Sequence, residues 1–302
     1  MGTKRRQRVR IAVLGAGAVG GALARELAAR GREVVLWSRS SAKARAAARG
    51  TRVTVERDLA RALEDAELVL LCASDAGLAE LVARVAALPL APRARVALHT
   101  SGALGARALA PLERRGFGTC ALHPLVPVPR DAAPGAFEGV GFALEARDPN
   151  VRAVATALAR ELGGEPFELS ARDAKERARY HAAATLVSNG ALALVSLALD
   201  DVLPPRLAHA KDRTLARSLA ILLERTARNL RELPPERALT GPAARGDLAT
   251  LHRHLATLPR RSPTRTAYAA LTRELVRLAQ ADRRIPPSTA RSILTLLEKS
   301  TR

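Results

Sequence analysis

Aromatic residues, cysteines and acidic residues are all scarce in this chain of 302 residues. Phe, Trp and Tyr together make up 2 % of it, which is too few for a platform on which nucleic-acid bases stack. The two cysteines, Cys72 and Cys120, allow at most one disulfide, which excludes a disulfide-stapled module. Both lie in apolar runs, so we expect two free thiols in a protein core, in a reducing compartment.

Acidic residues number 29 against 49 lysines and arginines, which gives a net charge of +20. Only five of the basic residues are lysines, and the excess is spread over both halves of the chain. We interpret this Ala- and Arg-rich composition as the mark of a GC-rich genome; the alternative is a real preference for anionic ligands such as phosphates. A nucleic-acid binder is the least favoured hypothesis, and a gel shift that is absent at ~150 mM salt would dismiss it.

We also recognise no uncharged apolar run of the roughly 20 residues that a bilayer span requires. The apolar segment Ile11–Leu14 behind the basic start Met1–Arg10 is too short for a signal peptide, and glycines follow it at once. Hydrophobic residues nevertheless make up 48 % of the chain, which is ample for a packed core. We expect a cytoplasmic protein with no membrane partner.

The first 170 residues alternate short apolar runs with helical patterns, which is typical of a parallel sheet covered by helices on both faces. The expected strands are Arg10–Leu14, Glu33–Trp37, Arg52–Glu56, Leu68–Cys72, Arg95–His99, Gly118–Leu122, Gly139–Glu145 and Pro166–Leu169. The expected helices are Val19–Arg30, Ala76–Ala87, Leu104–Arg115 and Val151–Leu162. We predict an α/β domain over residues 1–170, with a doubly wound, mostly parallel sheet.

From about Ala171 the strand signals stop and long helical stretches take over, with prolines at their joins. The expected helices are Arg172–Leu199, Arg206–Leu233, Ala244–Leu258, Thr264–Ala281 and Ser288–Lys299. We therefore predict an all-helical C-terminal domain over residues 171–302, with the domain boundary near residue 170.

A glycine-rich loop, Gly15-Ala-Gly17-Ala18-Val19-Gly20, connects the first expected strand to the first helix. In this context a G-x-G-x-x-G pattern is the fingerprint of a dinucleotide site. Gly15 permits the tight turn, Gly17 lets the backbone approach a pyrophosphate, and Gly20 lets the helix lie close to the sheet. The N–H groups that open the helix, at Ala18 and Val19, then face the phosphates. The alternative is a glycine-rich turn without a ligand.

In dinucleotide-binding folds, residues at the end of the second strand contact the 2′ position of the adenosine ribose. In this chain the segment there is Trp37-Ser38-Arg39-Ser40-Ser41. NAD sites usually place a carboxylate at this point, where it binds the ribose hydroxyls. This segment has none, and an arginine among hydroxyls suits a 2′-phosphate. We therefore predict NADP rather than NAD, bound by Ser38, Arg39 and Ser40, with Trp37 near the adenosine. Ser40 also fits a helix cap.

Polar side chains follow three further strands, at the sheet edge where ligands bind in open α/β folds. Ser74 follows the fourth strand and is expected at the cofactor, although it also fits a helix N-cap. His99 ends the fifth strand and Ser101 follows it, and His123 follows the sixth. We predict that Ser101 and His123 line the substrate pocket; the alternative for each histidine is a structural role.

Two segments of the helical half carry polar residues that packing does not require. At 100° per residue, His181, Thr185 and Asn189 share one face of a helix that is rich in alanine. We predict that this face lines the site, and the alternative is a face turned to solvent.

The second segment is Thr240-Gly-Pro-Ala-Ala-Arg245-Gly-Asp247. Its Thr240 and Arg245 fit the recognition of an anionic or polar substrate. The alternative is that Asp247 caps the following helix and pairs with Arg245 at the surface.

Together these segments resemble a bacterial family that joins a Rossmann-like NADP-binding domain to a helical domain of unknown function, and whose members are provisionally labelled NADP oxidoreductases. The matching segments are Gly15–Gly20, His99–Leu104, Leu122–Leu125, Tyr180–Ala184 with Ser188-Asn189, and Thr240–Asp247. They span nearly the whole chain. The resemblance implies a dehydrogenase-like scaffold and a homodimer formed through the helical domain.

The architecture is also similar to that of pyrroline-5-carboxylate reductase, ketopantoate reductase and 6-phosphogluconate dehydrogenase. Several of those enzymes place a catalytic lysine four residues before an asparagine on the first long helix. The matching positions here are Thr185 and Asn189, and the lysine is absent. The resemblance therefore implies neither their lysine chemistry nor their substrates for this chain.

The resulting hypothesis is an NADP(H)-dependent oxidoreductase that transfers a hydride between the nicotinamide and a small carbonyl or imine in a cleft between the domains. His181 is the expected general acid, because an imidazole exchanges protons near neutral pH, and Asn189 is expected to orient the substrate. No metal is expected. The alternative function is a non-catalytic NADPH-binding sensor or scaffold.

Overall fold

The computed structural model describes residues 10–91, 95–208 and 213–301. The chain divides into two compact units, residues 1–186 and 187–302. The domain boundary expected near residue 170 stays a prediction. Apart from Arg10, the basic segment at the start of the chain lies outside the described residues.

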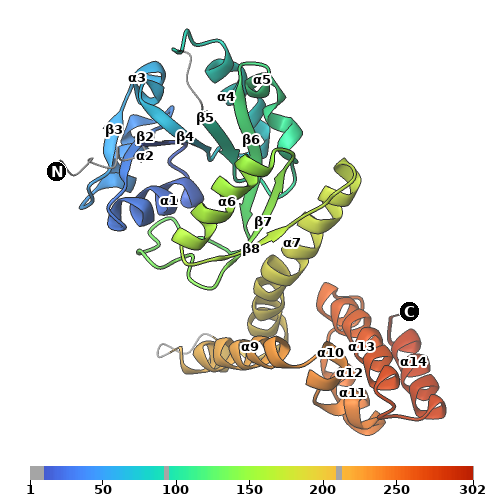
Figure 1. The fold of residues 1–302 in the computed structure, drawn as a ribbon. Coiled ribbons are helices and arrows are strands. Elements are labelled where there is room, and N and C mark those ends of the chain that lie inside the picture. Colours follow the sequence, from blue (N-terminus) through green and yellow to red (C-terminus); the bar gives the residue numbers. More distant parts are fainter. Residues whose placement is uncertain (1–9, 92–94, 209–212, 302) are drawn as a thin grey trace, which may run out of the picture. The chain divides into compact units, whose positions relative to one another are not determined.

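The first unit is built around an eight-stranded sheet (Figure 1). Its strands are β1 (Arg10–Leu14), β2 (Glu33–Trp37), β3 (Thr54–Glu56), β4 (Ala66–Leu71), β5 (Arg95–His99), β6 (Phe117–Pro124), β7 (Gly141–Ala146) and β8 (Glu165–Glu168). Their order is β3-β2-β1-β4-β5-β6-β7-β8, and only the pair β6–β7 is antiparallel among these described strands. The predicted doubly wound, mostly parallel sheet is confirmed. The strand order reverses between β1 and β4, and such a reversal marks the ligand crevice of these folds.

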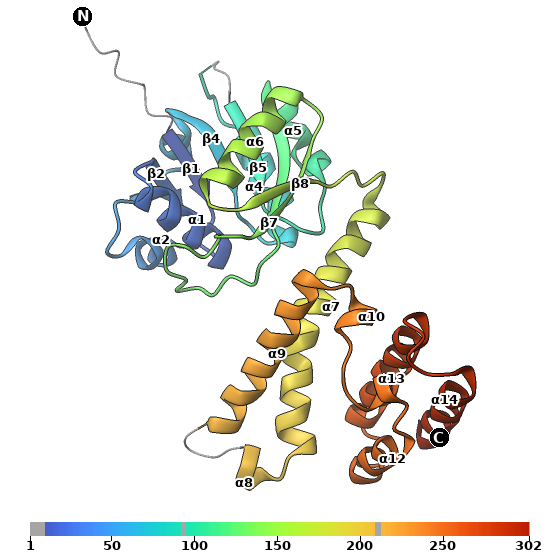
Figure 2. The same ribbon diagram turned by 60° about the horizontal axis from the view of Figure 1, so that its bottom comes forward.

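Helices cover both faces of the sheet (Figure 2). On one face, α1 (Ala18–Ala29), α2 (Ser41–Ala48) and α6 (Pro149–Glu161) share a buried apolar cluster. The other face carries α3 (Leu59–Leu63), α4 (Asp75–Ala86), the 3₁₀ turn η1 (Ala106–Leu109) and α5 (Ala110–Glu113). In β1, Ile11 and Val13 belong to the first cluster, whereas Ala12 and Leu14 belong to the second. The strand is buried on both faces, which explains its continuous apolar run.

The rest of the described chain is helical, which confirms the expected all-helical C-terminal region. Helix α7 (Ala174–Leu197) begins in the first unit and continues into the second, where it passes into the π-helical turn η2 (Ala198–Val202). The later helices are α8 (Pro205–Ala208), α9 (Thr214–Glu232), α10 (Pro235–Ala238), α11 (Pro242–Arg245), α12 (Leu248–Thr257), α13 (Pro263–Ala281) and α14 (Pro287–Thr301). A proline opens α10, α11 and α13, because its fixed φ suits the first turn and the N–H that it lacks has no partner there. The core of this unit contains Leu251, Val276 and Ile293.

Helices α7 and α9 leave large apolar side chains uncovered. Val187 is 76 % exposed, Leu192 70 % and Leu222 63 %. Within the described part of the chain, one helical stretch, Ala174–Val202, is long and apolar enough to cross a membrane, judged by length and composition alone. Its most apolar window of 18 residues has a mean hydropathy of 1.8, and none of that window is buried. This corrects the expectation that no such run exists, because residues 180–199 include no Asp, Glu, Lys or Arg.

Candidate functional site

The glycine loop between β1 and α1 is held by the two strands that flank β1. The Gly15 N–H donates to the Trp37 carbonyl at 2.8 Å, and the Cys72 N–H donates to the Leu14 carbonyl at 2.8 Å. Gly15 has a φ of +125°, which L side chains rarely adopt, and a Cβ there would collide with the Cys72 carbonyl. This turn therefore requires glycine at position 15.

Gly20 and Gly17 differ in what surrounds them. A Cβ on Gly20 would strike the Gly15 carbonyl, so this glycine lets α1 lie against the turn. A Cβ on Gly17 would meet nothing within 4 Å, and a pyrophosphate requires such open space beside the backbone. Gly17 is also the N-cap of α1, with no side-chain capping bond, which leaves the N–H groups of Ala18 and Val19 for an anion. The loop fits the phosphates of a dinucleotide.

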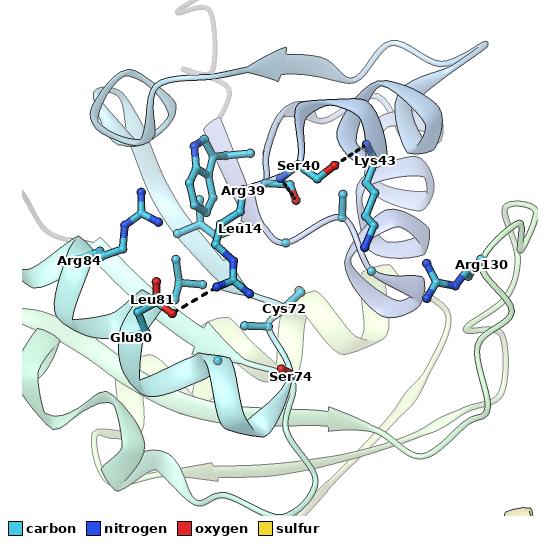
Figure 3. Close-up of a pocket in the computed structure, with 17 residues that line it drawn as sticks. Leu14, Arg39, Ser40, Lys43, Cys72, Ser74, Glu80, Leu81, Arg84 and Arg130 are labelled. Atoms are coloured by element: carbon cyan, nitrogen blue, oxygen red, sulfur yellow. Dashed lines mark hydrogen bonds and ion pairs between the residues drawn. The ribbon is translucent and has the colours of Figure 1, made fainter.

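A cavity of about 310 Å³ opens in front of this loop (Figure 3). Its walls are the β1–α1 loop, the segment after β2, the start of α4 and a side chain from the loop after β6. The charged residues that line it are Arg39, Lys43, Glu80, Arg84 and Arg130. Four of these five are basic, which suits a phosphorylated ligand.

The cofactor residues expected outside the glycine loop all line this cavity; they are Ser38, Arg39, Ser40 and Ser74. The Ser40 hydroxyl accepts from the Lys43 N–H at 3.3 Å, so its expected helix cap is confirmed at the start of α2. Ser74 occupies the N-cap position of α4 but makes no capping bond through its side chain. Trp37 also lines the cavity, and its indole N–H donates to the Arg57 carbonyl at 3.1 Å. Its position near the adenosine stays a prediction.

A second polar group gathers at the carboxyl ends of β5 and β6, against the first turns of α7. The Arg177 guanidinium, whose residue is 1 % exposed, donates to the carbonyls of Gly102 at 3.0 Å and Ser101 at 3.2 Å. It also donates to Glu145 Oε2 at 3.2 Å, and Glu145 Oε1 accepts from the Ala106 N–H at 3.0 Å. Burial lowers the pKa of Arg177, whereas the carboxylate of Glu145 raises it. These hydrogen bonds of Arg177 connect the start of α7 to the loop after β5.

His99 and Ser101 are tied into that loop. His99 Nε2 lies 3.0 Å from the Gly105 carbonyl, and His99 Nδ1 accepts from the Ser101 N–H at 3.2 Å. Because a carbonyl can only accept, the ring proton sits on Nε2 and the imidazole is neutral. Burial lowers the pKa of His99 to about 4. The Ser101 hydroxyl accepts from the Leu104 N–H at 3.0 Å, so it supports the turn, and its substrate role stays a prediction.

Three rings, His123, Tyr180 and His181, form what we call the ring cluster. His123 lies inside β6, which runs two residues further than the expected strand. The Tyr180 hydroxyl and His123 Nδ1 share a hydrogen bond of 2.9 Å, and the His123 and His181 centroids are 5.9 Å apart. A Cβ built on Gly102 would lie 2.5 Å from His181 Nδ1 and 2.8 Å from His123 Nε2. The two ring nitrogens therefore converge above one glycine.

The ring cluster has the chemistry of a proton-exchanging site. His181 Nδ1 is buried and has no hydrogen-bond partner within the described chain. Burial lowers the pKa of His123 to about 4 and raises the pKa of Tyr180. At neutral pH the cluster therefore offers a neutral imidazole at His123 and a protonated phenol at Tyr180, both able to donate or accept a hydrogen bond.

The remaining predicted residues all belong to the second unit. Asn189, further along α7, is exposed and belongs to the second unit. Thr240 and Arg245 also belong to that unit and are exposed. The Asp247 side chain accepts from the Thr250 N–H at 3.0 Å, so the helix cap considered for Asp247 is confirmed. The substrate roles of Asn189, Thr240 and Arg245 stay predictions.

Several residues at the site were not predicted from the sequence. Arg177 lies four residues before His181, so helical spacing alone places both on one face of the helix. This spacing could have identified Arg177 as a site residue from the sequence. Glu80, Arg130 and Glu145 carry no such signal, because each reaches the site from an element distant in the sequence.

Comparison with known proteins finds the same two-part organisation. Residues 1–124 match the Rossmann-like domain, and residues 140–275 match the domain of unknown function DUF2520. The resemblance expected from the sequence is confirmed for both parts. A search of curated proteins finds no match to the chain.

Solved structures share the fold. A Bacteroides fragilis protein provisionally named an NADP oxidoreductase is 24 % identical, with 89 % of this chain covering 98 % of that one at a TM-score of 0.69. A Thermotoga maritima protein is 21 % identical, with coverages of 91 % and 100 % and a TM-score of 0.62. The Aspergillus terreus reductive aminase in complex with NADPH is 17 % identical, with coverages of 98 % and 94 % and a TM-score of 0.53. These similarities establish the fold.

Proposed function

Because this chain joins a Rossmann-like domain to a DUF2520 domain, we propose that it is an NADP(H)-dependent oxidoreductase of small carbonyls or imines. The observation that carries the proposal is the open space beside Gly17, at the uncapped start of α1 and in front of a cavity with four basic side chains. Backbone N–H groups at a helix start bind a pyrophosphate, and basic side chains bind a further phosphate.

NADP(H) is favoured over NAD(H) by the residues that follow β2. Arg39 and Lys43 both line the cavity, and they carry the charge that a 2′-phosphate requires. Two of the similar structures support this choice by name, since the Bacteroides fragilis protein is named for NADP and the Aspergillus terreus enzyme is in complex with NADPH.

When bound, the nicotinamide supplies the hydride, and the residues of the chain supply the proton and the orientation. The loop after β5 adjoins the end of β4, because the Thr100 N–H donates to the Leu71 carbonyl at 3.3 Å. The ring cluster therefore lies along the same sheet edge as the cavity. Reduction of a carbonyl places charge on its oxygen, and a general acid must protonate it. We assign that role to His181, whose buried Nδ1 has no partner within the described chain.

Titration with NADPH and NADH tests the proposal. Trp37, the only tryptophan of the sequence, lines the cavity, so its emission should change saturably as the nucleotide binds. NADPH should bind more tightly than NADH and raise the melting temperature. No change in emission and no calorimetric heat with either nucleotide would contradict the proposal.

His181→Ala tests the assignment of the general acid. Turnover of NADPH with a responsive carbonyl or imine should fall by roughly 100-fold or more, whereas the Kd for NADPH should stay within about twofold, because His181 does not line the cavity. His252→Ala, at an exposed position of α12, is the control and should keep wild-type turnover. Equal turnover in the His181 variant would remove this residue from the mechanism.

Thr185 favours a second candidate function, a non-catalytic NADPH sensor or scaffold. The resemblance described in the sequence analysis implies a catalytic lysine at this position, and this chain has threonine there. This function predicts tight NADPH binding with no oxidation of NADPH across a broad panel of carbonyls and imines.

We further propose that a second copy of the chain covers the exposed apolar side chains of α7 and α9, giving a homodimer. Val187, Leu192 and Leu222 are each more than half exposed in the single chain. Asn189 within α7 and the arginines of α9 suit a protein partner in water better than the interior of a bilayer. We also propose that the protein is cytoplasmic and has no nucleic-acid or membrane partner.

A further inference from the structure

An ion pair joins the two sides of the cavity at the end where the 2′-phosphate is expected. Arg39, just after β2, places its Nη1 3.2 Å from Oε2 of Glu80, which belongs to α4 (Figure 3). Both residues line the cavity. The sequence places no carboxylate after β2, yet the fold brings one to the same pocket from 41 residues away.

Glu80 carries a negative charge in a cavity whose other charged residues are basic. Among the described residues that line the cavity, four are basic and Glu80 is the one acidic residue. Arg84, one turn further along α4, lies with its guanidinium carbon 5.1 Å from the centroid of the Trp37 ring. Lys43 and Arg130 also line the pocket, and within the described residues neither forms an ion pair with Glu80. The carboxylate therefore engages the same guanidinium that is proposed to bind the 2′-phosphate.

The ion pair between Arg39 and Glu80 is exposed to solvent. The side chain of Arg39 is 69 % exposed and that of Glu80 57 %, and an exposed pair of this kind contributes little to stability. The Arg39 guanidinium also lies beside Gly77, with Nη2 4.0 Å from the place where a Cβ would stand. No side chain at position 77 holds it there, so it can turn from Glu80 toward a ligand.

We infer that Glu80 competes with the 2′-phosphate of the cofactor for Arg39 and so sets how strongly this pocket discriminates NADP(H) from NAD(H). The inference rests on the proposed function, since it takes the cavity as the cofactor site. A phosphate monoester carries nearly two negative charges at neutral pH and offers more acceptor oxygens than a carboxylate, so it displaces Glu80 from Arg39. The displaced carboxylate stays on α4 and repels the phosphate, which weakens NADP(H) binding.

NAD(H) meets the opposite situation. It has no 2′-phosphate, so Arg39 keeps its partner, and Glu80 can accept from the ribose hydroxyls as the acidic residue of an NAD site does. Removing the charge of Glu80 therefore strengthens the binding of NADP(H) and does not strengthen that of NAD(H). Arg39 thus creates the preference for NADP(H) over NAD(H), and Glu80 reduces it.

The test compares the wild type with Glu80→Gln, which keeps the shape of the side chain and removes its charge. The Kd values of NADPH, NADH, 2′,5′-ADP and 5′-AMP are measured by calorimetry at one ionic strength. The ratio of the NADH Kd to the NADPH Kd should rise by about fivefold in the variant. The two adenosine fragments, which lack the nicotinamide, should show the same change. Glu113→Gln, an exposed position on α5 outside the cavity, should leave every ratio unchanged.

Two negative results have different meanings. If the wild type binds both dinucleotides and the ratio is unchanged in Glu80→Gln, the competition is absent and this inference alone is overturned. If the wild type binds neither dinucleotide, the proposed function falls and the inference falls with it. Thermal melting of both variants checks that their folds are intact, which the exposure of both glutamates leads us to expect.

Discussion

Arg177 shows how much one side chain can decide. Among the described residues it is one of the largest fully buried side chains, and its guanidinium donates to two carbonyls of the loop after β5 and to Glu145. A buried charge is tolerated only when it is paired and hydrogen-bonded. Its three partners therefore connect the first turns of α7, which carry Tyr180 and His181, to the loop after β5 and to β7.

Arg177→Ala should destabilise the protein by roughly 3 kcal/mol, because the change leaves a carboxylate and two carbonyls without their partner. Urea unfolding measures this loss. Arg179→Ala, at an exposed position two residues further along α7, is the matched control and should change the stability by less than about 0.5 kcal/mol. Equal stability of the two variants would contradict the proposed role of Arg177.

Two histidines make the stability depend on pH. Burial lowers the pKa of His99 and of His123 to about 4, whereas an unfolded histidine titrates near 6.5. Between these values the unfolded chain binds more protons than the folded one, so the free energy of unfolding rises with pH. The stability should fall on acidification from about pH 6.5 to pH 4, with an uptake of up to about two protons on unfolding.

Urea unfolding at several pH values measures this slope. The uptake should fall by about one proton in His123→Asn, because the asparagine does not titrate. A free energy of unfolding that does not change over this range would show that neither ring is held neutral by the fold.

At the scale of elements, two glycines of the β1–α1 turn have different roles. Gly20 is needed for folding, and Gly17 leaves space for a ligand. A methyl group on Gly20 would meet the Gly15 carbonyl, but one on Gly17 would meet nothing within 4 Å. Gly17 also has an ordinary φ of −75°. The same substitution therefore has different consequences three residues apart.

Gly20→Ala should lower the stability by more than about 2 kcal/mol, because the backbone must shift to admit the methyl group. Gly17→Ala should fold with stability within about 1 kcal/mol of the wild type, and it should lose roughly tenfold or more in NADPH affinity, because its methyl group occupies the pyrophosphate space. Thermal melting and NADPH titration measure the two effects. Wild-type affinity in Gly17→Ala would place the pyrophosphate elsewhere.

Helix boundaries show where local patterns mislead. One helix is expected over Leu104–Arg115, but the structure has the 3₁₀ turn η1 followed by α5, since Pro111 has no N–H to donate to the Arg107 carbonyl. One helix is also expected over Ala244–Leu258, but Gly246 ends α11 with a φ of +67° and Asp247 caps α12. Both breaks come from single residues inside a continuous apolar pattern.

At the scale of the whole molecule, the exposed leucines of α7 and α9 lead us to expect a homodimer. The wild type should elute from a sizing column with light-scattering detection at about twice 32.1 kDa. Leu192→Glu and Leu222→Glu should shift it toward the monomer, because a charge on a buried apolar contact is costly. Val154→Glu, on α6 and 39 % exposed, is the control and should leave the mass unchanged.

A monomeric wild type at micromolar concentration would contradict the homodimer. Flotation of the wild type with lipid vesicles would instead identify a bilayer as the partner of the apolar stretch Ala174–Val202.

The sequence by itself determined the alternation of strands and helices, the glycine turn and the basic segment after β2, because each of these depends on residues close together in the chain. Only the tertiary structure decided that Glu80 faces Arg39, that Arg177 reaches the loop after β5, and that His123 meets Tyr180. These pairs are separated by 41, 75 and 57 residues. Their contacts follow from strand order and from the packing of helices on the sheet, neither of which is encoded in a local pattern.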